Sequence, residues 1–203
     1  VKIQNLAGDF PLQDVTARWD TCRKDSVIWF TAVGYHFARR LHTELDVPVG
    51  LISTNWGGTR IEPWIPPVGF RQVPELAHQS AQVDLTDIGT EAGRANYIKS
   101  FKLLSEWSDQ VSQALEQGKT DLPKRPNIPS YRTNHQEATK IYNEMVHPLI
   151  PYAIRGAIWY QGESNGSEGD SYYHKKQALI GGWRTLWGQG DFPFYFVQLS
   201  SFQ

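Results

Sequence analysis

The side chains best suited to chemistry in this chain follow an apolar stretch at residues 156–160. Gln161, Glu163 and Asn165, which are two amides and a carboxylate, come directly after this stretch, and the stretch itself contains β-branched and aromatic residues. Such a run predicts a buried strand of an α/β sheet. Because ligands bind beyond the carboxyl ends of the strands in open α/β sheets, we expect this segment to lie in a functional site.

The same segment, residues 162–166, fits the pattern Gly-x-Ser-x-Gly, which is typical of the nucleophile elbow of α/β-hydrolases. In that fold the acid and the histidine follow the serine along the chain. The Asp and His residues that follow are Asp170, His174 and Asp191, and His174 stands only ten residues after Ser164, in an expected helix. We therefore favour a turn at a strand end, and a complete hydrolase that uses Ser164 stays open as an alternative.

A second apolar stretch, at residues 47–53, leads into the turn Gly57-Gly58-Thr59. Glycines at a strand end let main-chain N–H groups approach a ligand closely, which is how an oxyanion hole is built. The Lys and the spacing of a phosphate-binding Walker loop are not present. An oxyanion-binding turn and a plain tight turn both stay open from these residues alone.

The composition excludes several kinds of partner. The 203 residues carry 20 Lys and Arg against 21 Asp and Glu, so the net charge of −1 predicts no nucleic-acid or anionic-membrane partner. The single Cys22 excludes an intrachain disulfide and a Cys-based zinc cluster, and we expect no metal and no cofactor. Aromatic residues make up 13% of the chain, a share that suits core packing and also the stacking of sugar rings.

The apolar patterns predict an α/β domain. Strands are expected at 1–5, 47–53, 156–160 and 192–200, and helices at 31–45, 91–119, 138–145 and 172–187. Their alternation predicts a parallel sheet with right-handed crossovers. Residues 62–135 are expected to form a helical insertion, of which 62–88, with Trp64, run over the surface. Both ends of the chain fall at strands, so we expect a partial domain over 1–203. His147, set among apolar residues, is expected to be structural.

Three blocks of this sequence together resemble one family. They are Val49-Gly50-Leu51-Ile52-Ser53 with Trp56-Gly57-Gly58-Thr59, then Tyr142-Asn143-Glu144-Met145-Val146-His147-Pro148-Leu149, and Ile158-Trp159-Tyr160-Gln161-Gly162-Glu163-Ser164-Asn165. They are similar to the sialate O-acetylesterase group of the SGNH hydrolases. The resemblance implies a flavodoxin-like three-layer α/β/α sandwich that removes O-acetyl groups from sugars through a serine acyl-enzyme. It implies an O-acetylated carbohydrate substrate and a secreted, periplasmic or lumenal location.

The resemblance also assigns roles to residues. In this family the serine lies in a Gly-Gln-Ser-Asn block and the base in an Asp-x-x-His block, and neither block occurs here. By resemblance, Gly57 and Gly58 supply an oxyanion-hole N–H, the amides of Gln161 and Asn165 help to hold the oxyanion or substrate, and Glu163 orients the catalytic histidine. A helix-capping role for Glu163 and a turn role for Asn165 are the structural alternatives. A non-catalytic carbohydrate-binding domain of the same fold is the alternative function.

Overall fold

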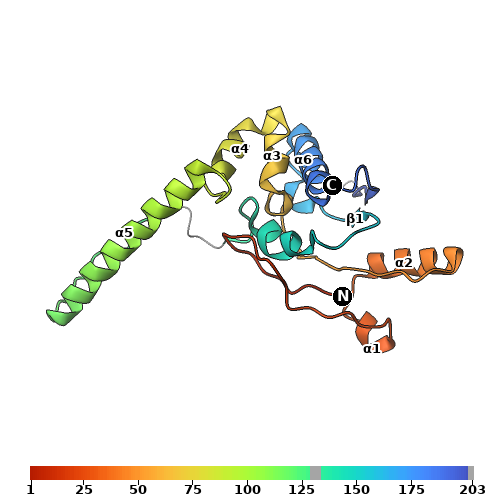
Figure 1. Ribbon diagram of the computed structural model, residues 1–203, viewed down its shortest axis with the longest axis horizontal. Helices are drawn as coiled ribbons and strands as arrows, with labels where there is room; N and C mark the ends of the chain where they lie inside the picture. Colours follow the sequence, from red (N-terminus) through yellow and green to blue (C-terminus); the bar gives the residue numbers. More distant parts are fainter. Residues whose placement is uncertain (129–133, 201–203) are drawn as a thin grey trace.

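The chain forms a helix-rich body from which one long helix extends, as the computed structural model in Figure 1 shows; residues 1–128 and 134–200 are described. The helices are α1 (Lys24–Val27), α2 (Ala32–Leu45), α3 (Pro67–Arg71), α4 (Ala77–Asp84), α5 (Glu91–Glu116) and α6 (Asp170–Trp187). Short 3-10 turns are η1 (Glu62–Trp64), η2 (Pro74–Leu76), η5 (His147–Leu149) and η6 (Glu163–Asn165), and η4 (Tyr142–Val146) is a π-helix. The strands are β1 (Ala157–Trp159) and β2 (Phe194–Phe196).

A small parallel sheet confirms the partial α/β class. β1 and β2 pair in parallel, with Ile158 opposite Tyr195, and α6 lies between them along the chain. The sequence predicts four longer strands, but residues 1–5 and 47–53 meet only in an isolated parallel bridge between Lys2 and Ser53. A strand needs a hydrogen-bonded neighbour along its length. Among the described residues these extended segments have too few such neighbours, so the ladder is shorter than the apolar runs.

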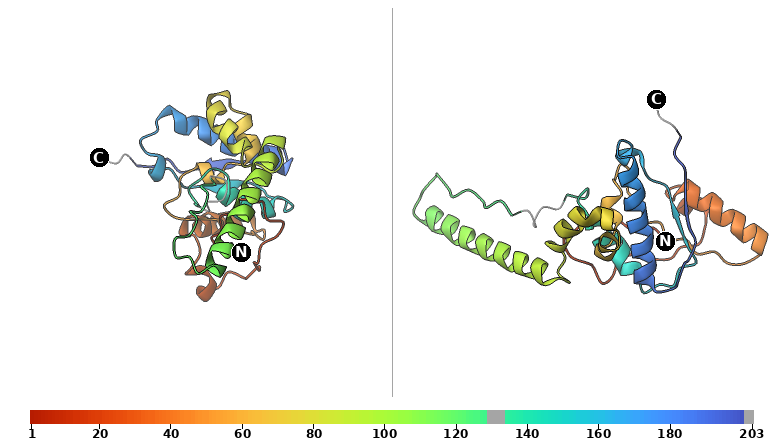
Figure 2. Two further views of the ribbon diagram at one scale, coloured as in Figure 1. Left: turned by 90° about the vertical axis from the view of Figure 1, so that its left-hand side faces the viewer. Right: turned by 90° about the horizontal axis from the view of Figure 1, so that it is seen from above.

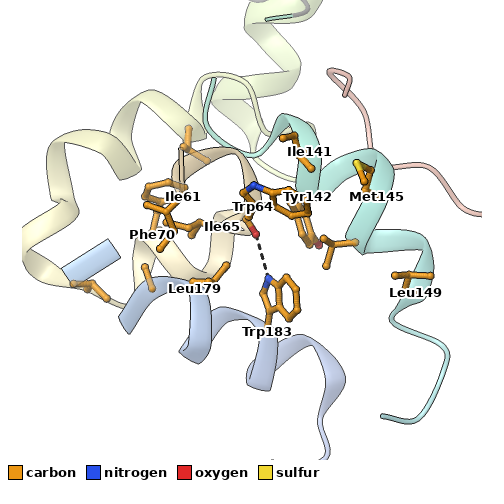
Figure 3. Close-up of a cluster of buried hydrophobic side chains, with 14 of the residues drawn as sticks. Ile61, Trp64, Ile65, Phe70, Ile141, Tyr142, Met145, Leu149, Leu179 and Trp183 are labelled. Carbon is orange, nitrogen blue, oxygen red and sulfur yellow. Dashed lines mark hydrogen bonds between the residues drawn. The ribbon is translucent and has the colours of Figure 1, made fainter. Parts of the chain in front are cut away.

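The core lies between α3, α6 and η4, and it corrects the expectation that residues 62–88 run over the surface. Trp64 is 3% exposed and Phe70 is fully buried. The indole N–H of Trp183 in α6 donates to the Trp64 carbonyl oxygen at 3.1 Å, the bond drawn in Figure 3. Helical periodicity is not visible in this segment because prolines start a series of helices too short to show it.

Helices α3 and α6 approach closely because glycines face each other across the contact. A Cβ atom on Gly69 would lie 2.2 Å from the carbonyl oxygen of Ala178, and one on Gly182 would lie 2.9 Å from the Gly69 Cα atom. Any side chain at either position would force the two helices apart. The absence of a side chain therefore sets the distance between the helices that form the core.

Helix α5 is the long amphipathic helix expected from the sequence, and it extends away from the body (Figures 1 and 2). The Thr90 side chain caps its first turn by accepting from the Gly93 N–H at 2.9 Å. Trp107 of α5 binds the segment that follows this helix, because its indole N–H donates to the Pro123 carbonyl oxygen at 2.9 Å. No helix among the described residues combines the length and apolar character needed to cross a membrane. The bounds of the insertion stay a prediction, and its residues 129–133 lie outside the described ones.

Candidate active site

Two turns that are about a hundred residues apart in the sequence lie side by side. The Ser164 hydroxyl donates to the Gly58 carbonyl oxygen at 3.1 Å. The Gln161 side chain donates to the Thr59 carbonyl oxygen at 3.0 Å. The turn that follows residues 47–53 is thereby joined to the turn that follows β1. The sequence places chemistry at the ends of both stretches, and the structure brings the two ends together.

The glycine turn presents free backbone donors. Gly58 has a φ of +78°, a left-handed conformation that favours glycine. Gly57 and Gly58 are exposed, and no atom would lie within 4 Å of a Cβ atom at either position. No described residue accepts a hydrogen bond from the N–H of either glycine. This geometry suits an oxyanion hole, because the two N–H groups are free to receive a developing negative charge.

Gln161 donates both of its side-chain amide hydrogens within the protein, and Asn165 donates one of its two, to Glu62. Gln161 Nε2 donates to the Thr59 carbonyl and, at 2.8 Å, to Asn165 Oδ1. Asn165 is 2% exposed, and its Oδ1 also accepts from the Ile61 backbone N–H at 2.9 Å. An oxyanion role for either amide stays a prediction, and for Gln161 it requires one of these bonds to be exchanged. In the arrangement seen, both side chains position the two turns.

A buried ionic network lies directly behind this pair. Lys175 of α6, with a side chain 6% exposed, donates to Glu62 Oε1 at 2.7 Å and also contacts Glu168. The second Glu62 oxygen accepts from Asn165 Nδ2 at 3.1 Å. Arg60 contacts Glu168 and lies 3.4 Å from Glu62. The network therefore connects η1, the 161–168 segment and α6.

The charges in this network change the acidity of one carboxyl group. Burial by itself would raise the pKa of the Glu168 carboxyl, but hydrogen bonds from Lys175 and Arg60 hold that pKa below its usual range. The ionised form of Glu168 is therefore favoured in the folded chain. An ionised carboxylate at this position keeps the buried Lys175 ammonium paired.

Glu163 differs from its neighbours because its side chain is exposed and makes no hydrogen bond with the described residues. It stands at the first position of η6, after Gly162, and does not cap that turn with its side chain. A free carboxylate on the exposed side of the turn is available to an incoming group. Its predicted role, holding a histidine base, is compatible with this position and stays a prediction.

Besides the ionic network, the structure adds Gln136 and a stacked pair of rings that the sequence analysis did not single out as parts of the site. Gln136 Nε2 donates to the Gly58 carbonyl at 3.0 Å, and Gln136 Oε1 accepts from the Arg60 backbone N–H at 2.9 Å. The His135 ring stacks on Trp56, with ring centres 4.6 Å apart and planes 7° from parallel. Nearly eighty residues separate these partners, and no local pattern in the sequence marks the contact. His147, by contrast, lies outside this site and contacts the Leu12 carbonyl through Nδ1 at 2.8 Å.

The site offers groups that form hydrogen bonds and carry charge. Within residues 1–128 and 134–200, no group of three or more His, Cys, Asp or Glu side chains is arranged to hold a metal ion. The site offers free backbone N–H groups at one turn and an exposed carboxylate at the other. These are the components that stabilise an oxyanion and orient a base.

Comparison with known proteins supports the resemblance seen in the sequence. A family model described as "Carbohydrate esterase, sialic acid-specific acetylesterase" matches residues 106–203. The sialate O-acetylesterase of Rattus norvegicus is 31% identical over 183 residues, which cover 86% of this chain and 30% of that protein. The human sialate O-acetylesterase is 30% identical over 182 residues, which cover 85% of this chain and 26% of that protein. The chain thus spans less than a third of the length of these relatives.

A solved structure supports the same grouping. The crystal structure of a carbohydrate acetylesterase from Xanthomonas citri matches with a TM-score of 0.63 and 26% sequence identity, over 98% of this chain and 33% of that chain. The agreement extends across nearly the whole chain. The sequence and the fold of this chain are therefore both similar to carbohydrate acetylesterases.

Proposed function

We propose that this chain, which resembles the sialate O-acetylesterase group of carbohydrate esterases, contributes part of the active site of an enzyme that hydrolyses acetyl esters on sugars. The reaction proceeds through a serine acyl-enzyme. The nucleophile and the base come from residues outside the chain, in the Gly-Gln-Ser-Asn and Asp-x-x-His blocks that its sequence lacks. The substrate is an O-acetylated carbohydrate, O-acetylated sialic acid first among them.

The observation that carries this proposal is the contact between the glycine turn and the turn after β1. Ser164 and Gln161 donate to the carbonyls of Gly58 and Thr59, which fixes the glycine turn, and no described residue accepts from the N–H groups of Gly57 and Gly58. A rigid pair of free donors is what acyl transfer requires, because the donors must be in place before charge develops. The similarity to carbohydrate acetylesterases supports an acetyl group as the acyl group that is transferred.

The residues of the chain then have distinct tasks. The serine attacks the acetyl carbonyl, and the oxygen that becomes negative accepts hydrogen bonds from the Gly57 and Gly58 N–H groups. Glu163 accepts a hydrogen bond from the histidine that takes the serine proton, which fixes its tautomer and stabilises the imidazolium. One well-placed oxyanion donor contributes about 3 kcal/mol at the transition state. Gln161 and Asn165 keep the two turns in register.

The proposal is tested by measuring acetate release from an aryl acetate and from O-acetylated sialic acid. The chain by itself is expected to give no turnover above buffer, and the chain expressed with its flanking coding sequence is expected to be active. Glu163→Gln in the longer protein is expected to abolish most of that activity. Activity of the longer protein that is indifferent to Glu163→Gln would contradict the proposed role of this site.

Two other outcomes point to the alternatives. Turnover by the chain alone that Ser164→Ala abolishes would make Ser164 the nucleophile. Ser164 Oγ donates to the Gly58 carbonyl and has no hydrogen bond to a histidine among the described residues, so we do not expect this result. A flanking sequence without a Gly-Gln-Ser-Asn block, together with sugar binding but no hydrolysis, would favour the non-catalytic carbohydrate-binding domain.

A further inference from the structure

A second hollow lies apart from the two turns of the candidate active site. It is a cleft of about 290 Å³ between the 9–11 segment, α3, the loop between α4 and α5, and residues 139–147. None of the residues assigned to the esterase site lines it. Its volume is at the lower end for small-molecule pockets, which corresponds to a ligand smaller than a typical drug.

One wall of the cleft carries a polar group that lacks a partner in the protein. Tyr142 of η4 lines the cleft and is only 4% exposed, and its hydroxyl forms no hydrogen bond with a described residue. The hydroxyl oxygen is not one of the fully buried, unpaired side-chain atoms of the described residues, so it is open to solvent. Burial and the negative charge of Asp87 raise the pKa of Tyr142, so the hydroxyl keeps its proton and is a donor. An acceptor group of a ligand in the cleft can take the place of water at this donor.

His147 supplies an acceptor on the same wall. Its Nδ1 lies 2.8 Å from the Leu12 carbonyl oxygen, which can only accept, so Nδ1 carries the proton. Nε2 is then a free acceptor, and no described residue donates to it. The Tyr142 ring stands edge to face with the imidazole, with ring centres 5.9 Å apart, and both residues line the cleft.

The charged side chains Asp9, Arg71 and Asp87 that line the cleft are paired within the protein, and Arg71 is shared between two carboxylates, which leaves an excess of negative charge. Arg71 lies 2.7 Å from Asp84 and also contacts Asp87. Asp9 is paired with Lys140, and both side chains are buried. A charged ligand would have to compete with these pairs, whereas a neutral ligand leaves them intact. The charge pattern therefore favours an uncharged molecule.

The backbone beside the cleft is strained. Thr139 lines it with a φ of +69°, and a β-branched residue rarely adopts such a conformation. The π-helix η4 follows directly, and π-helical turns occur often at functional sites. The remaining wall is apolar, with Pro11, Pro66 and Leu186. An apolar wall opposite a hydroxyl donor and an imidazole acceptor fits a ring with C–H faces and hydroxyl edges.

We propose that this cleft binds a neutral, polyhydroxylated molecule the size of a monosaccharide, with Tyr142 and His147 as its hydrogen-bonding partners. The inference does not depend on the esterase function, because the cleft and the two turns share no lining residue.

The test is a titration of the isotope-labelled chain with galactose, N-acetylglucosamine and xylitol, followed by amide chemical shifts. N-acetylneuraminic acid, an anion, is the charge control. At least one neutral probe is expected to give saturable shifts centred on Gly89, Thr139 and Asn143, and the anion to bind at least tenfold more weakly. Tyr142→Phe is expected to weaken binding about tenfold, the effect of one lost buried hydrogen bond. Tyr173→Phe, at an exposed tyrosine of α6, is the matched control and is expected to leave binding unchanged.

Ile88→Trp provides a second variant that does not disturb the core. Ile88 is 40% exposed at the rim, so a larger ring there fills the cleft without entering the interior. This substitution is expected to abolish the saturable shifts. The proposal is overturned if no neutral probe gives saturable shifts, if binding persists in Ile88→Trp, or if the shifts gather at residues 57–58 and 161–165 instead. If these shifts are observed but the chain expressed with its flanking coding sequence releases no acetate, the esterase proposal alone is refuted.

Discussion

Removing the buried ammonium of Lys175 tests whether the network behind the site holds the two turns together. Lys175 contacts both Glu62 and Glu168, whose side chains are only 15% and 14% exposed. Lys175→Met keeps most of the length and apolar stem of the side chain and deletes the charge. The two carboxylates then face each other, with Arg60, a half-exposed residue, as the remaining cation nearby.

The expected loss of stability at pH 7 is about 3 kcal/mol, the lower range for breaking a buried ion pair by removal of one partner. The loss depends on pH. The pKa of Glu168 is lowered in the folded chain, so the stabilisation is present above the unfolded value of about 4.3 and is lost as the pH falls through the folded value. In the variant this lowering is smaller, because only Arg60 remains as a cation beside Glu168. The difference in unfolding free energy between the two proteins is therefore expected to shrink below about pH 4.3.

Urea unfolding followed by tryptophan fluorescence at pH 7 and at pH 4 measures both effects. Lys176→Met is the matched control, because the neighbouring Lys176 lies over the rings of Tyr172 and Phe196 at 4.8 and 4.0 Å and pairs with no carboxylate. Lys176→Met is expected to lower the unfolding free energy by about 1 kcal/mol, and this loss is expected to be the same at both pH values. If Lys175→Met is no more destabilising than Lys176→Met at pH 7, the network does not carry the stability assigned to it. A difference that is the same at both pH values would refute the electrostatic explanation.

Three further substitutions test the packing and the site. Gly69→Ala is expected to destabilise the chain by about 3 kcal/mol, because its Cβ atom would lie 2.2 Å from a carbonyl oxygen of α6. A melting temperature equal to that of the unsubstituted chain would contradict the close contact between α3 and α6. Gly57→Ala, with nothing within 4 Å of the new atom, is expected to change the unfolding free energy by less than about 0.5 kcal/mol, and a larger loss in urea titration would show that the turn is not open. Asn165→Ala removes the oxygen that accepts from the Ile61 N–H and the Gln161 amide, and it is expected to lower the unfolding free energy by about 2 kcal/mol. Hydrogen exchange at the Ile61 N–H should accelerate. Unchanged protection would count against the hydrogen bond between Ile61 and Asn165.

The sequence predicts the helices of this fold well and the sheet less well. α2, α5 and α6 begin and end within a few residues of their predicted bounds, because each carries apolar residues at helical spacing, and α2 and α5 are capped by Thr31 and Thr90. The strands could not be sized from the apolar runs, because pairing depends on neighbours that lie elsewhere in the chain. The core position of Trp64 could not be predicted either, because the short turns in this segment, which begin at prolines, show no helical periodicity.

The candidate site, like the fold, could be predicted only in part. The strand-end positions of Gly58 and Gln161 identify both turns, since polar or glycine residues directly follow apolar runs there. Their contact, and the roles of Gln136 and Lys175 in maintaining it, depend on side chains separated by 78 residues or more. Asn165 shows most clearly what cannot be predicted from the sequence alone. Its residue type suggests a ligand contact or a turn, and only the structure shows a buried side chain bonded on both ends.

The most direct test of the central claim is the rate of acetate release from O-acetylated sialic acid by the chain expressed with its flanking coding sequence, with and without Glu163→Gln. If Glu163 orients the catalytic histidine, kcat is expected to fall about a thousandfold or more with little change in KM, since loss of the orienting carboxylate affects the transition state and not substrate binding. The far-UV circular dichroism spectrum and melting temperature are expected to stay unchanged, because the side chain is exposed. Activity within twofold of the unsubstituted protein would contradict the account of this site.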